Sequence, residues 1–278
     1  MATLLSAMLD LARVDAPDGD DTTVYRTTVD PTFTIGPKVH GGTLQMISGR
    51  AAYQAFVDGG GDAEVHPLAI TSDYLYAPDP ADVELVTRIR KRGRTVSVVD
   101  VEVRQNDRIV VTNSVVLGRL DHGEPRYSTP TLPLRDLPVE PPSTGVVVGQ
   151  SPMADIVHVA NAIEFVIDPS TFGPAGGDTS RPVISGWVRP LDGDPDLDFL
   201  TLVCDVSPPV VFNLGLFGWA PTVQLSTYLR RRPAPGWVRF QSSSTEVGQG
   251  MFEEDHLVID STGVVVAQSR QLALIPNG

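Results

Sequence analysis

The chain has 278 residues, 41% of them hydrophobic, and a formal net charge of −13. This acidic balance disfavours nucleic acid as a partner. The single cysteine, Cys204, excludes an intramolecular disulfide and a zinc site built from cysteines. The histidines lie far apart, so we expect no metal site, and no apolar run is long enough to span a membrane. The N-terminus has no basic leader, which predicts a cytoplasmic protein.

The first element that the sequence predicts is a helix that begins at Gly41-Gly42. Apolar residues recur at helical spacing through the following segment, TLQMISGRAAYQAFVD. Alternating β-branched residues then predict strands, and residues 95–120 predict a hairpin with its turn at Asn106-Asp107. These features indicate a helix packed on an antiparallel sheet.

A proline-rich segment follows. Residues 120–144 (LDHGEPRYSTPTLPLRDLPVEPPST) have almost no apolar periodicity, which predicts an extended linker. We therefore expect a first domain over residues 1–119 and a second domain over residues 145–278.

The second half repeats the order of the first. The segment LDFLTLVCDVSPPVVFNLG occupies the place of the helix, and Pro208-Pro209 should end or kink that helix just after Asp205. Residues 253–275 predict a hairpin with its turn at residues 261–263. Without a gap, Pro78, Pro80 and Gly93 fall on Pro233, Pro235 and Gly248. We interpret this frame as an internal duplication.

The two halves also resemble a known family. VHGGTLQMISGRAAYQAF and the strands after it resemble the first hot-dog domain of type II acyl-CoA thioesterases. FLTLVCDVSPP, PTVQLSTYLRRRP and GMFEEDHLVIDSTGVVVAQSRQLALI resemble their second domain, in the form common in actinobacteria. The resemblance implies an α+β double hot-dog fold, in which each repeat is an antiparallel sheet wrapped around a central helix.

The resemblance also implies a reaction and its partners. It implies the hydrolysis of fatty acyl-CoA to free fatty acid and CoA, with no cofactor apart from the CoA of the substrate. Fused hot-dog proteins often pair further through their sheets, so a homo-oligomer is compatible with it. The sequence fixes neither the acyl length nor the physiological substrate.

By resemblance, the family's water-activating trio of Asp, Ser or Thr, and Gln falls on Asp205, Thr222 and Gln271, with Ser226 as the alternative hydroxyl. A carboxylate can take the proton of a water that a hydroxyl and an amide hold in place. The family's usual Asp-His pair after the hydroxyl residue is Gln224-Leu225 here, which affects the local pocket chemistry.

Donors for the developing oxyanion are expected at the first predicted helix. Helix starts offer free backbone N–H groups and the positive end of the dipole, and glycines allow a close approach. The candidates are the backbone N–H groups at Gly41, Gly42 and Thr43. His40 either touches substrate or has a structural, capping role.

The repeat alignment predicts a single active site. It places Pro67 opposite Thr222 and Val116 opposite Gln271, and it places Arg50 (or Ser48, with a gap) opposite Asp205. The first half therefore lacks the trio, and the second predicted helix begins without a Gly-Gly turn.

The phosphates of CoA require local positive charge on an acidic protein. Two clusters are candidates. The first is Arg88, Arg90, Lys91, Arg92 and Arg94, which a solvated charge run would also explain, and the second is Arg230, Arg231 and Arg232.

Two other functions compete with hydrolysis. A hot-dog hydratase or dehydratase needs a His paired with an acid, and neither predicted helix offers that spacing. A catalytically silent acyl-CoA-binding protein or sensor would keep the tunnel and lose the trio. The presence of Asp205, Thr222 and Gln271 together argues against the silent protein.

Overall fold

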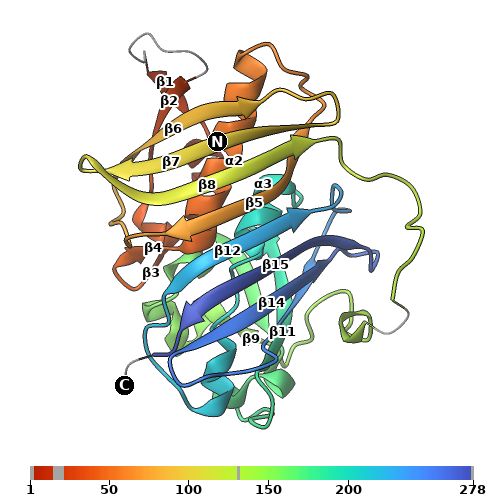
Figure 1. The fold of residues 1–278 in the computed structure, drawn as a ribbon. Coiled ribbons are helices and arrows are strands. Elements are labelled where there is room, and N and C mark those ends of the chain that lie inside the picture. Colours follow the sequence, from red (N-terminus) through yellow and green to blue (C-terminus); the bar gives the residue numbers. More distant parts are fainter. Residues whose placement is uncertain (1–2, 15–21, 130–131, 277–278) are drawn as a thin grey trace.

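The computed structural model describes residues 3–14, 22–129 and 132–276. One antiparallel sheet extends through both halves, and Figure 1 shows it curving around two helices. In the figure the first half (red to yellow) lies above the second half (green to blue). Among the described residues, no helix combines the length and apolarity needed to cross a membrane.

The first half contains the long helix α2. Leu44, Ile47, Ala51 and Ala55, which the helical spacing places on one face, are all buried in it. The elements of this half are α1 (Leu4–Met8), β1 (Ala12–Val14), β2 (Thr22–Thr28), η1 (Pro31–Phe33), β3 (Thr34–Ile35), β4 (Lys38–Val39), α2 (Gly41–Asp58), β5 (His66–Tyr74), β6 (Asp82–Lys91), β7 (Val96–Gln105) and β8 (Arg108–Gly118).

The second half repeats this order with a much shorter helix, α3. Its helix and strands are β9 (Val146–Val147), β10 (Ile163–Ile167), β11 (Val183–Pro190), α3 (Leu197–Val203), β12 (Thr222–Leu229), β13 (Val238–Ser243), β14 (Met251–Ile259) and β15 (Val265–Leu274). Short 3-10 turns lie before and between them, and these are η2 (Pro133–Arg135), η3 (Val148–Gln150), η4 (Pro152–Asp155), η5 (His158–Asn161), η6 (Pro169–Thr171), η7 (Gly173–Ala175) and η8 (Val210–Leu214).

Helix α3 ends two residues before Asp205, so the expectation that it ends just after Asp205 needs correction. Its last helical residue is Val203. If the helix continued, the ring of Pro208 would meet the carbonyl group of Cys204, four residues earlier. Asp205 therefore lies in the turn after α3, where helical geometry does not fix the direction of its side chain.

The halves join through β5 and β12, which pair antiparallel in the middle of the sheet. The strand order is β1-β2-β6-β7-β8-β5-β12-β15-β14-β13-β11-β10-β9. Thr71 lies opposite Ser226, with the two hydroxyl oxygens 3.2 Å apart and a sequence separation of 155. The same offset relates Pro78 to Pro233, so a pseudo-two-fold axis passes between Thr71 and Ser226. The duplicated topology predicted from the sequence is present.

The expected hairpin turns are also present. Asn106 and Asp107 have φ values of 52° and 59°, and Gly263 has a φ of 82°. Positive φ at two consecutive residues is the signature of a type I′ hairpin turn, which Asn and Asp tolerate.

Part of the proline-rich segment packs on the second half. Leu134 is buried, the indole N–H of Trp187 donates to the carbonyl oxygen of Pro138 at 2.8 Å, and Arg239 donates to that of Leu137 at 2.9 Å. The domain boundaries expected at residues 119 and 145 stay a prediction.

Candidate active site

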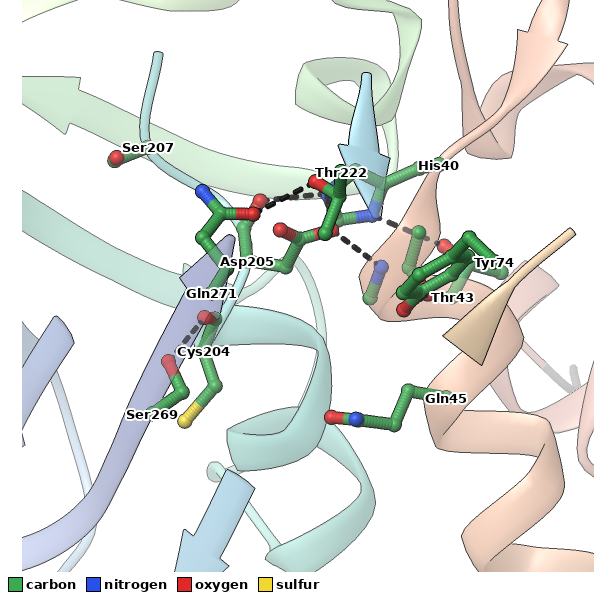
Figure 2. A network of polar contacts seen from close by, with 12 residues as sticks. His40, Thr43, Gln45, Tyr74, Cys204, Asp205, Ser207, Thr222, Ser269 and Gln271 are labelled. Carbon is green, nitrogen blue, oxygen red and sulfur yellow. Dashed lines mark hydrogen bonds and ion pairs between the residues drawn. The ribbon is translucent and has the colours of Figure 1, made fainter. Parts of the chain in front are cut away.

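Asp205 of the second half contacts the start of α2 in the first half. The backbone N–H of Gly42 donates to Asp205 Oδ2 at 2.6 Å. His40 Nε2 lies 2.8 Å from the backbone carbonyl oxygen of Asp205 and 3.4 Å from Oδ2. Figure 2 shows the carboxylate between this helix start and the pair formed by Thr222 and Gln271. The fold thus brings together the acid and the glycine turn that the sequence places in different halves.

The glycines at the start of α2 allow this close approach. A Cβ atom on Gly41 would lie 2.8 Å from Asp205 Oδ2, and one on Gly42 would lie 2.8 Å from the carbonyl oxygen of Leu202. Real Cβ contacts are almost never that short. The Tyr74 hydroxyl donates to the carbonyl oxygen of Gly41 at 2.9 Å and holds the turn from the other side.

Thr222 and Gln271 are bonded to each other at the edge of the same space. Thr222 begins β12, and its hydroxyl donates to Gln271 Oε1 on β15 at 2.7 Å. Ser226, the alternative hydroxyl, instead contacts Thr71 at the join of the two halves and does not line the cavity described below. Leu225, one of the two residues that depart from the family pattern, lies directly opposite Gln271.

Burial controls the protonation of the acidic groups at the site. It raises the pKa of Asp205, whose side chain is 9% exposed, while the nearby His40 ring and the Gly42 N–H act in the opposite direction. A raised pKa makes a carboxylate a stronger base. Burial also raises the pKa of Cys204 to about 12, which keeps it a thiol.

A cavity of about 770 Å³ opens beside these groups. Its polar lining includes His40, Asp205, Thr222 and Gln271. Most of the remaining lining is apolar and comes from both halves, including Ile35, Val39, Leu44, Leu75, Met153, Ile156, Val157, Phe212, Phe217 and Trp219. An apolar pocket with a few convergent polar groups is the usual form of a small-molecule site.

The predicted oxyanion donors are only partly available. The Gly42 N–H is bonded to Asp205, and the N–H of the buried Thr43 donates to the carbonyl oxygen of His40 at 3.2 Å. Neither residue lines the cavity, whereas Gly41 does. The described residues provide no acceptor for the Gly41 N–H, so of the three candidates it is the one left to meet a ligand.

Both predicted basic clusters lie away from the cavity. Val96, which begins β7, and His66, which begins β5, both pair with Gly118 at the end of β8. The tip of the β6–β7 hairpin, which contains Arg92, therefore lies at the end of the sheet where β5 begins. The cavity residue Tyr74 ends β5, and a nine-residue strand spans roughly 30 Å. Arg88, Arg90 and Arg94 share this hairpin with Arg92, and Arg90 is paired with Asp100 at 2.6 Å.

The second cluster lies at the same distant end. Arg230 follows the last residue of β12, whereas the cavity residue Thr222 begins that strand. Arg232 lies 2.8 Å from His66 Nε2. Neither cluster lines this cavity, and the expectation that one of them meets the phosphates of CoA stays a prediction. The Arg108 guanidinium stacks 4.5 Å from the centre of the Tyr76 ring, and Tyr76 lines the cavity.

Several residues of the site were not predicted as such. Neither Tyr74 nor Trp219, which is 49% exposed, was identified from the sequence, and both line the cavity. His40 was left between two roles, and the structure places its ring against Asp205. The predicted equivalent of Asp205 in the first half, Arg50, is paired with Asp198 at 3.7 Å.

Comparison with known proteins agrees with the geometry. Family models of the acyl-CoA thioesterase N-terminal domain and C-terminal domain match residues 28–118 and 135–275. Uncharacterized proteins of Mycobacterium tuberculosis and Mycobacterium bovis are 39% identical to the chain over 99% of each sequence.

Solved structures share the whole fold. A Thermobifida fusca protein assigned as a candidate thioesterase II is 28% identical, covers 99% of this chain and 98% of its own, and has a TM-score of 0.83. An acyl-CoA thioesterase II of Mycobacterium marinum is 16% identical, covers 99% and 97%, and has a TM-score of 0.68. A hot-dog protein of Alicyclobacillus acidocaldarius matches with a TM-score of 0.75, at 17% identity and full coverage of both chains. The chain belongs to the acyl-CoA thioesterase family and is a thioester hydrolase with a double hot-dog fold.

Proposed function

We propose that this protein hydrolyses fatty acyl-CoA to free fatty acid and CoA, with a water activated by Asp205, Thr222 and Gln271. One observation carries the proposal. The carboxylate of Asp205 lies at the glycine turn of the other half, beside the Thr222–Gln271 pair, on a mostly apolar cavity.

The hydrogen-bonding capacity left at these groups suits one water. Asp205 Oδ1 and Gln271 Nε2 have no hydrogen-bond partner among the described residues. Thr222 gives its proton to Gln271, so its oxygen can still accept. A water here donates one hydrogen to Asp205 and one to Thr222 and accepts from the Gln271 amide. Its remaining lone pair is free to attack.

In the proposed reaction, the water oxygen attacks the thioester carbonyl carbon while Asp205 takes the proton. The Gly41 N–H donates to the oxyanion of the tetrahedral intermediate. The C–S bond then breaks, and the proton held by Asp205 passes to the CoA sulfur. A positioned base contributes roughly 10²–10⁴-fold to the rate, and an oxyanion donor contributes about 3 kcal/mol. This scheme uses no metal and no further cofactor.

The apolar part of the cavity suits the acyl chain. For the phosphates of CoA we propose Arg108, because it stacks on Tyr76 at the cavity and the two arginine clusters lie at the other end of the sheet. A cytoplasmic location and a homo-oligomer stay predictions.

The proposal is tested with purified protein and a series of acyl-CoA chain lengths. Free thiol release is followed with a chromogenic reagent, and binding is measured separately by calorimetry. The single cysteine is buried and adds little background. Asp205→Asn should bind as the parent does and lose at least about 10² in kcat. Binding of acyl-CoA without thiol release from any chain length would instead identify a silent acyl-CoA-binding protein.

A further inference from the structure

The buried carboxyl group of Glu254 has no part in the reaction described above. Glu254 lies on β14 and is 2% exposed. The repeat offset places Val99, an ordinary core residue, at the equivalent position of the first half. Burying a carboxyl group costs several kcal/mol unless hydrogen bonds compensate. A buried acid in only one of two related halves therefore points to a task specific to that half.

The contacts of Glu254 are concentrated on the segment that follows Asp205. Its Oε1 accepts from the Ser207 hydroxyl at 2.9 Å and from the Ser242 hydroxyl at a shorter distance. Its Oε2 accepts from the backbone N–H of Val210 at 3.2 Å. Ser207 and Val210 flank the proline pair that ends the helical path, so one side chain holds both ends of this turn against the sheet.

Glu254 is also a neighbour of the amide in the trio. It lies directly opposite Gln271 in the β14–β15 pairing, and residues that are directly opposite each other share a face of the sheet. Gln271 in turn accepts the hydrogen bond from Thr222. The carboxyl group is thus linked to the Asp205 turn on one side and to the Thr222–Gln271 pair on the other.

The hydroxyl of Ser207 allows this brace to work in either protonation state of Glu254. Ser207 Oγ lies 2.9 Å from Glu254 Oε1 and 3.0 Å from the carbonyl oxygen of Pro208. It can donate to a Glu254 carboxylate, or it can accept from a protonated Glu254 and donate to Pro208. Burial, and to a smaller extent the charge of Asp205, raises the pKa of Glu254 to about 7, so both states occur near neutrality.

We propose that Glu254 is a positioning residue for the reaction, which holds the Asp205–Val210 turn so that the Asp205 carboxylate faces Gly42 and the Thr222–Gln271 pair. This inference rests on the proposed function. It assigns to Glu254 no contact with the substrate, so its loss should lower kcat and leave acyl-CoA binding unchanged.

The test compares two substitutions on the same strand that copy the first half. Glu254→Val copies Val99 and removes the brace. His256→Val copies Val101, and His256 is buried on the same face with an Nε2 that has no hydrogen-bond partner among the described residues. Since a misplacement of about 1 Å can cost 10²-fold, we expect Glu254→Val to lower kcat by about 10- to 10²-fold with KM within twofold, and His256→Val to leave both unchanged.

Two further variants keep the test decisive if Glu254→Val does not fold. Glu254→Gln should retain the bonds from the serine hydroxyls and lose only that from the Val210 N–H, because its amide nitrogen is a donor. Its kcat should lie between those of the parent and Glu254→Val, and Ser207→Ala should also lower kcat. Parent-like kcat in both Glu254→Gln and Ser207→Ala, or equal losses in His256→Val, would overturn the inference.

A measurement without turnover separates this inference from the proposed function. Amide hydrogen exchange at Gly42, at residues 205–207 and at Val210 should be faster in Glu254→Gln than in the parent and unchanged in His256→Val. If the parent releases no thiol but the exchange differs as stated, the proposed reaction fails and the brace stands. If the parent is active, Asp205→Asn is inactive and exchange is the same in every variant, the brace alone is wrong.

Discussion

Gly41→Ala is the substitution whose effect follows most directly from the geometry of the site. The added methyl group would lie 2.8 Å from Asp205 Oδ2 and 3.3 Å from the Tyr74 hydroxyl oxygen, so it is confined from two sides. To reach an ordinary contact distance of 3.4 Å, the carboxylate must move by about 0.6 Å. A displacement of about 1 Å at a reacting group can cost 10²-fold, so a loss of about tenfold or more in kcat is expected.

Gly49→Ala on the same helix is the matched control. Its methyl group would meet the terminal Cδ1 of Ile70 at 2.8 Å, and the next atom lies at 3.8 Å. A side-chain end can rotate away, and alanine favours a helix interior by about 1 kcal/mol over glycine. Gly49→Ala should therefore keep the parental kcat.

The assay is steady-state thiol release from one saturating acyl-CoA, with binding measured in parallel. Gly49→Ala should bind the substrate as the parent does, because Gly49 does not line the cavity. Gly41 does line it, so for Gly41→Ala the binding measurement separates an effect on substrate binding from the expected effect on kcat. If Gly41→Ala keeps kcat within twofold of the parent, the placement of the carboxylate at the glycine turn does not limit the reaction. Equal losses in both alanine variants would assign the effect to α2 as a whole.

Three further outcomes follow from the same structure. Burial raises the pKa of the Asp205 carboxyl group above its ordinary value of 3.8, so the folded state loses stability as pH rises from 3.8 through the pKa of the folded state. In thermal melts, the stability of Asp205→Asn relative to the parent should therefore increase with rising pH. A pH-independent difference would contradict the burial argument. Thr222→Val should lower kcat by about tenfold or more while Thr222→Ser retains it, because only a hydroxyl group can bond both Gln271 and the water. Equal kcat values in the two variants would exclude this role of the hydroxyl group. Arg108→Ala should raise KM for acyl-CoA and leave kcat/KM unchanged for an N-acetylcysteamine thioester, which carries no phosphate. Equal effects on the two substrates would exclude a phosphate contact.

Much of the fold could be predicted because local and repeated signals agree. The shared proline and glycine frame, the helical spacing after Gly41-Gly42 and the Asn106-Asp107 turn each depend on neighbouring residues. The candidate trio came from the family resemblance, and the structure brings its members together. Their catalytic roles remain predictions for the assays above.

The remaining features depend on contacts between residues far apart in sequence. His40 meets Asp205 across 165 residues, and no local pattern indicates that pair. The distance of the arginine clusters from the cavity could not be predicted, because charge alone does not tell which end of a hairpin faces the cavity. The sequence does contain a signal for Glu254, which alternates in phase with Phe252 and Val258, so that its side chain points into the core.

The prediction of one active site in this pseudo-two-fold molecule is explained by the unequal lengths of α2 and α3. Helix α2 has 18 residues and α3 has seven, although the repeat places them at equivalent positions. At the offset of the repeat, Asp205 corresponds to Arg50, which lies inside α2 and cannot leave the helix surface. Shortening α3 releases Asp205 toward the N–H groups that begin α2, and the proline pair prevents the helix from re-forming. Because the helix does not continue, the Val210 N–H has no helical carbonyl group to bond, and the Glu254 carboxyl group accepts its hydrogen bond instead. The same interruption of the helix therefore places Asp205 at the start of α2 and leaves a turn that the buried Glu254 holds.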